Sequence, residues 1–513
     1  MARSFGAITG PRWPGVAVVT LVLTVVIGTL AVVTLRADHR AGLGAADIAA
    51  IRFTVFQAFL SALLSVFLAV PVARALSRRT FCGRQALITL LGAPFILPVI
   101  VAVLGLLAVF GRQGVLNQVL VTFGMEKVSI YGLSGILLAH VFLNLPLAVR
   151  MILLGWQAVP AERFRLAAAL GASTWSLIEW PMLRRTVPSA FAAIFLICLT
   201  SFSVALILGG GPNATTVELA IYQAVRFEFA LDRAALLASI QCALSLVAAV
   251  FAWRLAGFGT HGAGLGRPID RFDGRERHSR VVDMVVICAL AIFLLLPMAL
   301  IIWRGVGGLA DLPDSLWLAI RYSILVAGAA TFLTTIMAVF VALRGGGAIA
   351  LASALPMAAS ALVVGTGLFI ALQYFGNPTR WALVVTAGMN ALLALPFAIR
   401  IIAPAVQDSV ENYGRLAAGL GIGNWRFLWL VILPLARRPL GFAMGLTAAM
   451  SVGDLGVIAL FSTGKEQTLP LLMYQLMGSY RTDAAWGAAL VLLCLAFAAF
   501  AVFDFWGRRG ADT

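Results

Sequence analysis

Residues 145–175 read LPLAVRMILLGWQAVPAERFRLAAALGASTW, and residues 395–425 read LPFAIRIIAPAVQDSVENYGRLAAGLGIGNW. The pattern Leu-Pro, then Arg-Leu-Ala-Ala, Leu-Gly and Trp returns with an offset of 250 residues. Downstream, Thr-x-x-Leu-x-x-Tyr-Gln starts at Thr216 and again at Thr468, an offset of 252. Matches in the same order at nearly one offset indicate an internal duplication.

The composition excludes a water-soluble fold. Of the 513 residues, 62% are hydrophobic and 11% are charged, whereas about 25% are charged in an average soluble domain. A soluble fold could not bury that much apolar surface. This excludes a soluble enzyme, a nucleic-acid-binding protein and a disordered chain. The sequence therefore predicts an all-α polytopic membrane protein.

A helix that crosses a bilayer needs about 20 mostly apolar residues, and we expect twelve such spans, six in each repeat. An even number keeps the two copies in the same orientation, so the repeats are parallel rather than inverted. We expect a first repeat at 1–256, a polar linker at 257–281 and a second repeat at 282–513. The expected spans lie near 15–35, 53–74, 87–110, 131–149, 187–209, 234–256, 282–303, 317–342, 349–374, 381–400, 440–461 and 484–506.

The excess of basic residues, which gives a net charge of +16, helps to predict which side of the membrane the termini face. Basic residues accumulate in cytoplasmic loops, and 25 of the 37 lie on the side that carries both termini. We therefore expect both termini in the cytoplasm. The first span is too long for a signal-peptide core and should remain in the mature protein.

The loop after each fourth span contains a Leu/Ala-rich helical segment, a glycine that can end it in the left-handed conformation, a tryptophan and a proline. At these residues the chain resembles the permease subunits of bacterial type I ABC importers, whose cytoplasmic Glu-Ala-Ala…Gly loop docks on the ATPase subunit. Arg165 and Arg415 replace the glutamate of that pattern. The glycine-to-proline spacing is 10 residues in the first loop and 13 in the second, so about one helical turn is missing from the first. The resemblance implies that the ATPase-coupling residues are Arg165, Ala167, Ala168, Gly171, Trp175, Pro181, Arg415, Ala417, Ala418, Gly421, Trp425 and Pro434.

A finer resemblance, along nearly the whole chain, is to the fused permeases of thiamine and thiamine pyrophosphate importers. It implies an inner-membrane permease that works with two ATPase copies and a periplasmic thiamine-binding protein, and that takes a small-molecule substrate. Fused permeases for ferric iron or another small cation share the architecture, and an ion-coupled secondary transporter is the alternative of another class. The segments that carry the resemblance are 57–65, 109–114, 138–142, 209–223, 451–454 and 478–481.

The chain is not predicted to be an enzyme. It has no Gly-x-x-x-x-Gly-Lys-[Ser/Thr] phosphate loop, because Gly464-Lys465 is followed by Glu466. Histidines, cysteines and acids show no metal-ligand spacing, so we expect no catalytic residue, no metal and no cofactor, and ATP hydrolysis would fall to a partner.

An ionisable group inside a span is costly and needs an explanation. Asp454, in the eleventh span, could contact a cationic substrate, pair with an arginine or serve as a gate element, and the offset of 250 pairs it with Val204. His140, Asn144 and Asn390 could line the substrate path or form hydrogen bonds between helices.

Two outer segments follow the fifth span of each repeat. They could form a surface for the binding protein or a lid on the path, or they could be short packing helices capped by the two threonines. The residues concerned are Thr216, Tyr222, Gln223, Thr468, Tyr474 and Gln475.

Overall fold

The structure is a computed structural model that describes residues 10–37, 43–92, 96–209, 211, 214–255, 277–462, 464 and 466–509, except the side chains of 357 and 358. All regular structure in these residues is helical. In a bilayer only a helix or a closed barrel pairs every backbone group internally, so long apolar segments become helices. Eleven helices are long and apolar enough to cross a membrane, or twelve if one bent pair counts as a span. The prediction of an all-α polytopic protein is confirmed.

The described residues of the predicted first repeat form eleven α-helices. They are α1 (Trp13–Arg36), α2 (Ala45–Arg78), α3 (Arg84–Leu90), α4 (Val99–Phe110), α5 (Val115–Thr122), α6 (Leu133–Gln157), α7 (Ala161–Ala169), α8 (Trp180–Leu199), α9 (Ser203–Leu208), α10 (Val217–Arg226) and α11 (Leu231–Leu255).

The second repeat follows the same order with different local insertions. Its helices are α12 (Arg277–Gly307), α13 (Ser315–Arg344), α14 (Gly347–Ala358), α15 (Ala361–Gln373), α16 (Ala382–Gly419), α17 (Asn424–Phe427), α18 (Leu433–Leu435), α19 (Arg437–Val452), α20 (Gly456–Phe461), α21 (Leu469–Gly478) and α22 (Thr482–Arg508). Of the predicted linker, residues up to 276 lie outside the described part of the chain.

The third and fifth spans of both repeats are interrupted, although the sequence suggested continuous helices. The expected span 87–110 becomes α3 and α4, and the expected span 349–374 becomes α14 and α15, which are bent by 82°. Proline explains the position of the breaks in the two third spans, because it lacks an N–H and clashes with the preceding turn. Pro98 immediately precedes α4, and Pro356 lies near the end of α14.

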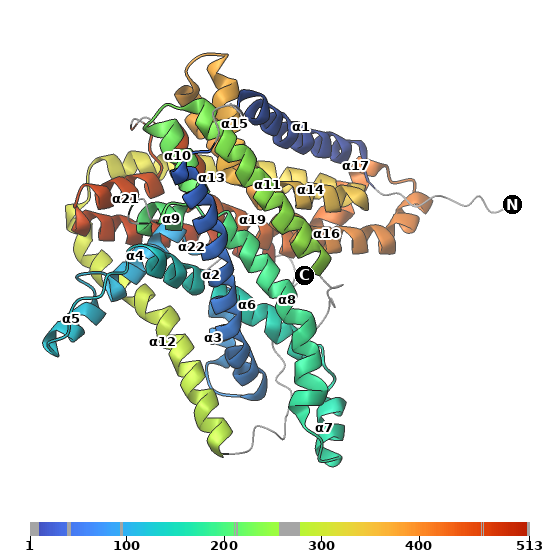
Figure 1. Cartoon of the computed structure of the whole chain (residues 1–513). Helices are drawn as coiled ribbons and strands as arrows, with labels where there is room; N and C mark the ends of the chain where they lie inside the picture. The colour runs from blue at the N-terminus through green and yellow to red at the C-terminus, as the bar shows by residue number, and fades with distance from the viewer. Residues whose placement is uncertain are drawn as a thin grey trace.

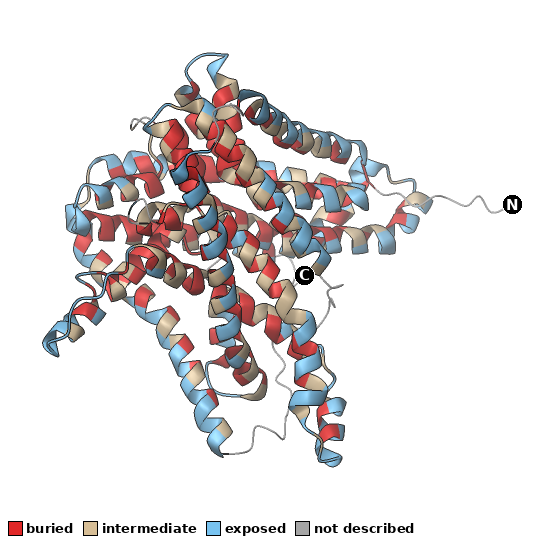
Figure 2. Cartoon of the chain, viewed as in Figure 1, coloured by how far each residue is buried: buried red, intermediate tan, exposed pale blue. Residues whose placement is uncertain are grey.

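The first helix of each repeat packs on the other repeat. Helix α1 packs against α13, α14 and α15, and α12 packs against α2 and α4 as well as against α22. In Figure 1, α1 (dark blue) runs beside the orange and gold helices of the second repeat. The boundary between repeats along the chain is therefore not a boundary in packing. Figure 2 shows the buried residues concentrated in the centre of the helical bundle, while α12 and the segment around α7 are largely exposed.

Candidate functional site

Each of the two repeated loops that are predicted to couple to an ATPase begins with the same helix-ending turn. Gly171 and Gly421 follow α7 and α16 and have positive φ angles of +60° and +68°. In the first loop the N–H of Ala172 donates to the carbonyl of Ala167 at 2.9 Å, and the second loop repeats this bond at 3.0 Å. This is the Schellman ending, which requires a left-handed residue and favours glycine. The predicted role of the two glycines in ending a helix is confirmed.

The two loops expose equivalent apolar side chains. Arg165 and Arg415 are also exposed, whereas Ala167 and Ala417 are buried beneath the turn. Clustered exposed apolar groups at an end of the bundle mark an interaction surface. The exposed apolar residues common to both loops are Leu166, Leu170 and Trp175 in the first and Leu416, Leu420 and Trp425 in the second.

The loops differ after the tryptophan. Trp175 starts a π-helical turn, Trp175–Glu179, which leads directly into α8. In the second loop Trp425 lies within α17, and the π-helical turn Leu428–Ile432 follows it. The additional residues of the second loop thus form one extra helical turn, in agreement with its longer glycine-to-proline spacing.

Each loop tryptophan is held by the end of the second long helix of its repeat, but by different chemistry. The guanidinium of Arg74, on α2, lies 5.2 Å from the centre of the Trp175 ring and forms an ion pair with Glu179 at 2.8 Å. Glu179 is fully buried. Phe340, on α13, instead meets Trp425 edge to face at 6.1 Å. Glu179 is not among the residues predicted from the sequence, although an acid inside an apolar stretch before a proline is a usable signal.

The intramembrane polar residues singled out from the sequence are buried and join helices. Ser61 Oγ lies 3.0 Å from His140 Nδ1, which connects α2 to α6. Asn144 lies 3.4 Å from the Cys198 sulfur on α8. In the second repeat, Asn390 donates to Ser451 Oγ at 2.9 Å, which connects α16 to α19.

Asp454 lies in the break between α19 and α20. One carboxylate oxygen accepts from the N–H of Gly456 at 3.3 Å, and the other is buried with no hydrogen-bond partner among the described residues. The adjacent Gly453 touches the opposite repeat, because a Cβ added there would lie 2.8 Å from the side chain of Pro98. Asp454 is thus placed at the contact between the two repeats.

The structure corrects the residue paired with Asp454. Helix α9 begins at Ser203 and α20 at Gly456, an offset of 253 rather than 250. The counterpart of Asp454 is therefore Ser201, not Val204. The three-residue shift arises from the extra turn of the second coupling loop, which lies between the matched motifs and the fifth span.

The outer segments form the short helices α10 and α21, and each is attached in the same way. The N–H of Val217 donates to Thr54 Oγ1 at 2.9 Å, and the N–H of Leu469 donates to Ser323 Oγ at 2.8 Å. These two hydroxyls stand at equivalent places on α2 and α13. The equivalence of these two residues is hard to recognise in the sequence. The two segments share only a hydroxyl residue that follows Arg-Phe in one repeat and Arg-Tyr in the other.

Of the six residues predicted on the outer segments, Thr216, Tyr222 and Thr468 are buried, and Gln475 is exposed. Gln223 and Tyr474 are half-buried. The capping alternative holds for Thr216, whose hydroxyl accepts from the N–H of Leu219 at 3.3 Å. Thr468 precedes α21 but forms no such side-chain bond.

Helix α10 also carries a buried acid. Glu218 faces Ser360, which precedes α15 of the other repeat, and Gln241 on α11. Burial raises the pKa of Glu218 to about 8, so the group is mostly protonated at neutral pH. Tyr222, one turn later, packs on Phe202 with ring centres 5.3 Å apart.

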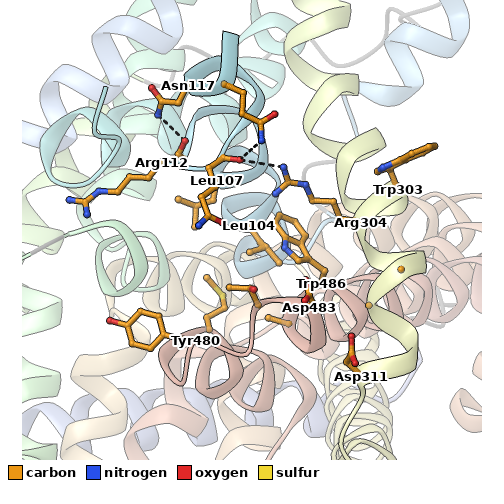
Figure 3. A pocket seen from close by; sticks show the side chains of 18 of the residues that line it. Leu104, Leu107, Arg112, Asn117, Trp303, Arg304, Asp311, Tyr480, Asp483 and Trp486 are labelled. Carbon is orange, nitrogen blue, oxygen red and sulfur yellow. Dashed lines mark hydrogen bonds between the residues drawn. The ribbon is translucent and has the colours of Figure 1, made fainter. Parts of the chain in front are cut away.

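A cavity of about 1330 Å³ opens at the end of the bundle opposite the coupling loops. It lies among the ends of α4 and α12 and the beginning of α22 (Figure 3). Arg304 stacks over Trp486 at 5.2 Å beside the acids Asp311 and Asp483. Two of the segments that carry the family resemblance, 109–114 and 478–481, contribute to its wall.

No family model matches the chain. The chain is 38% identical over 536 aligned positions to the thiamine transport system permease protein ThiP of Escherichia coli (strain K12), with 98% of each chain covered. It is 36% identical to the protein of the same name from Haemophilus influenzae, with 86% of each covered. The chloroplastic sulfate permease 2 of Chlamydomonas reinhardtii is 28% identical over 48% of this chain and 73% of its own.

Proposed function

Because the chain belongs to the family of thiamine transport system permease proteins, we propose that it is the membrane-spanning subunit of an ATP-driven importer and provides the path for thiamine. The observation that carries the proposal is the similarity over nearly the full length to a protein of that name. The relatives' names favour thiamine over the ferric-iron alternative. We propose thiamine pyrophosphate as a second substrate of the same path.

The motor would be supplied by two copies of an ATPase subunit, one for each coupling loop. Two features support this assignment: the sequence lacks a phosphate loop, and the loops expose matching leucine and tryptophan side chains. Six of the twelve residues named above would act in two ways. Trp175 and Trp425 would contact the ATPase directly, whereas Gly171 and Gly421 with the buried alanines would hold the turn.

The path would run between the two repeats. Asp454 would act on a cation there, because its second carboxylate oxygen has no hydrogen-bond partner among the described residues and its neighbour touches Pro98 of the other repeat. The positive charge of the thiazolium ring suits a carboxylate. His140, Asn144 and Asn390 are proposed to shape this path by fixing the helices around it.

A periplasmic binding protein would deliver the substrate to the end that carries α10 and α21. Direct contact there would fall to Gln475 and to the rim of the large cavity, while Thr216, Tyr222, Gln223, Thr468 and Tyr474 would position the helices. Both termini and the coupling loops would then face the cytoplasm, in line with the distribution of basic residues.

The decisive experiment is uptake by cells that lack this chain, with and without its restoration. Labelled thiamine, labelled thiamine pyrophosphate and labelled ferric iron are compared before and after ATP depletion. Thiamine uptake that returns with the chain and disappears on ATP depletion supports the proposal. Restored iron uptake without thiamine uptake overturns the substrate, and uptake that survives ATP depletion overturns the mechanism.

A second experiment tests the coupling surface. We expect the double variant Leu166→Glu, Leu416→Glu to lose co-purification of the ATPase subunit, because charge replaces exposed apolar contacts in both loops. Phe123→Glu is the matched control, since Phe123 is an exposed apolar residue at the opposite end of the bundle. Equal recovery of the ATPase with the unchanged chain, the double variant and Phe123→Glu would contradict the assignment of the loops.

A further inference from the structure

A second cavity, of about 890 Å³, lies beside α12 at its Arg277 end. One wall is the turn after α2 together with α3, and the other is a single face of α12. The α12 residues that line it follow helical spacing: Arg280, Met284, Ile287, Cys288, Ala291 and Leu295. In Figure 1 this end of α12 extends away from the bundle. We call this cavity the α12 groove.

The walls of the α12 groove are apolar along most of its length. From α3 it receives Ala86, Leu87 and Leu90, and beyond Arg280 the α12 face carries no charged side chain. The α12 groove opens beside a helix long and apolar enough to cross the membrane. At that depth no water can solvate its walls, so an apolar chain is the occupant that satisfies them.

The length of the apolar part of the α12 groove is close to the thickness of the hydrocarbon layer in one leaflet of a bilayer. Met284 and Leu295 are 11 residues apart, which is about 16 Å along a helix that rises 1.5 Å per residue. Half of a hydrocarbon core about 30 Å thick is about 15 Å. The apolar part of the α12 groove therefore has the length of one acyl layer, and Arg280 lies about one helical turn beyond it, at headgroup depth.

The end of the α12 groove at Arg280 carries a positive charge. Asp283 is buried and paired with Arg78 at 2.6 Å and Arg79 at 2.7 Å. The charge of Asp283 is therefore balanced by these two arginines and does not neutralise Arg280. Arg280 is exposed and has no acidic partner among the described residues. A guanidinium pairs well with a phosphate, and basic sites between membrane helices favour anionic lipid headgroups.

We propose that the α12 groove binds an anionic phospholipid, with an acyl chain between α3 and α12 and the phosphate at Arg280, beside the ion-paired Arg79. The lipid completes the packing of α12, which reaches across from the second repeat and is fastened at this end by Asp283. The site is distinct from the substrate path and from the coupling loops.

The test uses the full-length chain in lipid nanodiscs with a phosphatidylglycerol that carries a photoactivatable acyl chain. Crosslinks are mapped by peptide mass spectrometry and competed with unlabelled phosphatidylglycerol or phosphatidylcholine. We expect crosslinks on α3 and on residues 284–295, displaced at least fivefold better by phosphatidylglycerol. Arg280→Gln should reduce them at least fivefold. Arg254→Gln, at the exposed end of α11, is the matched control and should leave them unchanged.

Filling the α12 groove gives an independent check. Ala291→Trp and Ala86→Trp place a large ring in it from opposite walls, and either one should abolish the crosslinks while the protein remains monodisperse. Crosslinks that survive either substitution, or that are spread evenly over other helices, would overturn the site. Equal competition by phosphatidylcholine would overturn the anionic headgroup.

Discussion

Replacing Gly421 with valine should uncouple ATP hydrolysis from transport. At φ +68° the residue is left-handed, and a Cβ added there meets no atom within 4 Å. The cost is therefore backbone strain alone, about 1–2 kcal/mol for an ordinary L-residue. A change of that size shifts an equilibrium by about 5–30-fold. The turn closed by the N–H of Ile422 on the carbonyl of Ala417 would therefore open about 5–30 times more often, and Trp425 would be positioned less firmly.

Three further substitutions separate the effect of backbone strain from the effect of side-chain size. Gly419 is the last residue of α16, also has open space at its Cβ, and has no positive φ. Gly419→Val adds the same side chain without left-handed strain, and Gly419→Ala reproduces Ala169 of the first loop. Gly421→Asn should recover most of the coupling, because asparagine tolerates the left-handed conformation.

The assay is thiamine transported per ATP hydrolysed in proteoliposomes that contain the permease, its ATPase and its binding protein. We expect this ratio to fall several-fold for Gly421→Val and to remain near the original for Gly419→Val. The valine variant of Gly171 should behave like that of Gly421. If Gly421→Val and Gly419→Val gave the same ratio, strain at the turn would not be the cause and the coupling role would be refuted.

The remaining predictions concern four polar side chains, of which Asp454 is half-buried and the other three are buried. Asp454→Asn should lower thiamine uptake while assembly with the ATPase persists, and equal uptake would remove Asp454 from the path. Glu179→Gln leaves Arg74 without its charge partner and should lower the free energy of unfolding. We expect the decrease to be smaller than the about 3–5 kcal/mol typical of a fully buried ion pair, because Arg74 is partly exposed. An unchanged thermal midpoint would contradict this. Ser323→Ala strands the N–H of Leu469, which costs about 1–3 kcal/mol, whereas Ser323→Thr, the residue type of the other repeat, should be neutral in thermal unfolding. Glu218 has a folded pKa of about 8 and an unfolded pKa of about 4.3. The folded state thus holds a proton that the unfolded state releases, and stability should fall as pH rises from about 4.3 to 8. Glu218→Gln should flatten that dependence, and parallel pH profiles of the two proteins would refute it.

Much of the candidate site could be found by reading the chain. The two glycines that end α7 and α16 were recognisable because a helix end that needs a left-handed residue selects glycine from its immediate neighbours. The polar residues His140, Asn144 and Asn390 were recognisable because they are rare inside apolar spans. Their partners were not, because Ser61, Cys198 and Ser451 lie on other helices and only packing brings them within bonding distance.

Hydropathy was sufficient for the helical class and for the approximate number of spans, which is eleven or twelve among the described residues. The parallel arrangement of the two repeats stays a prediction from the internal duplication. These properties depend on segments of about 20 residues and on the copying of the whole unit. They could not show that α1 and α12 cross to the opposite repeat, because either repeat offers an apolar surface and shape complementarity selects between them. Nor could they pair Asp454 with Ser201 or place Gly453 against Pro98. Those relations follow from side-chain packing between segments hundreds of residues apart, which leaves no periodic trace in the chain.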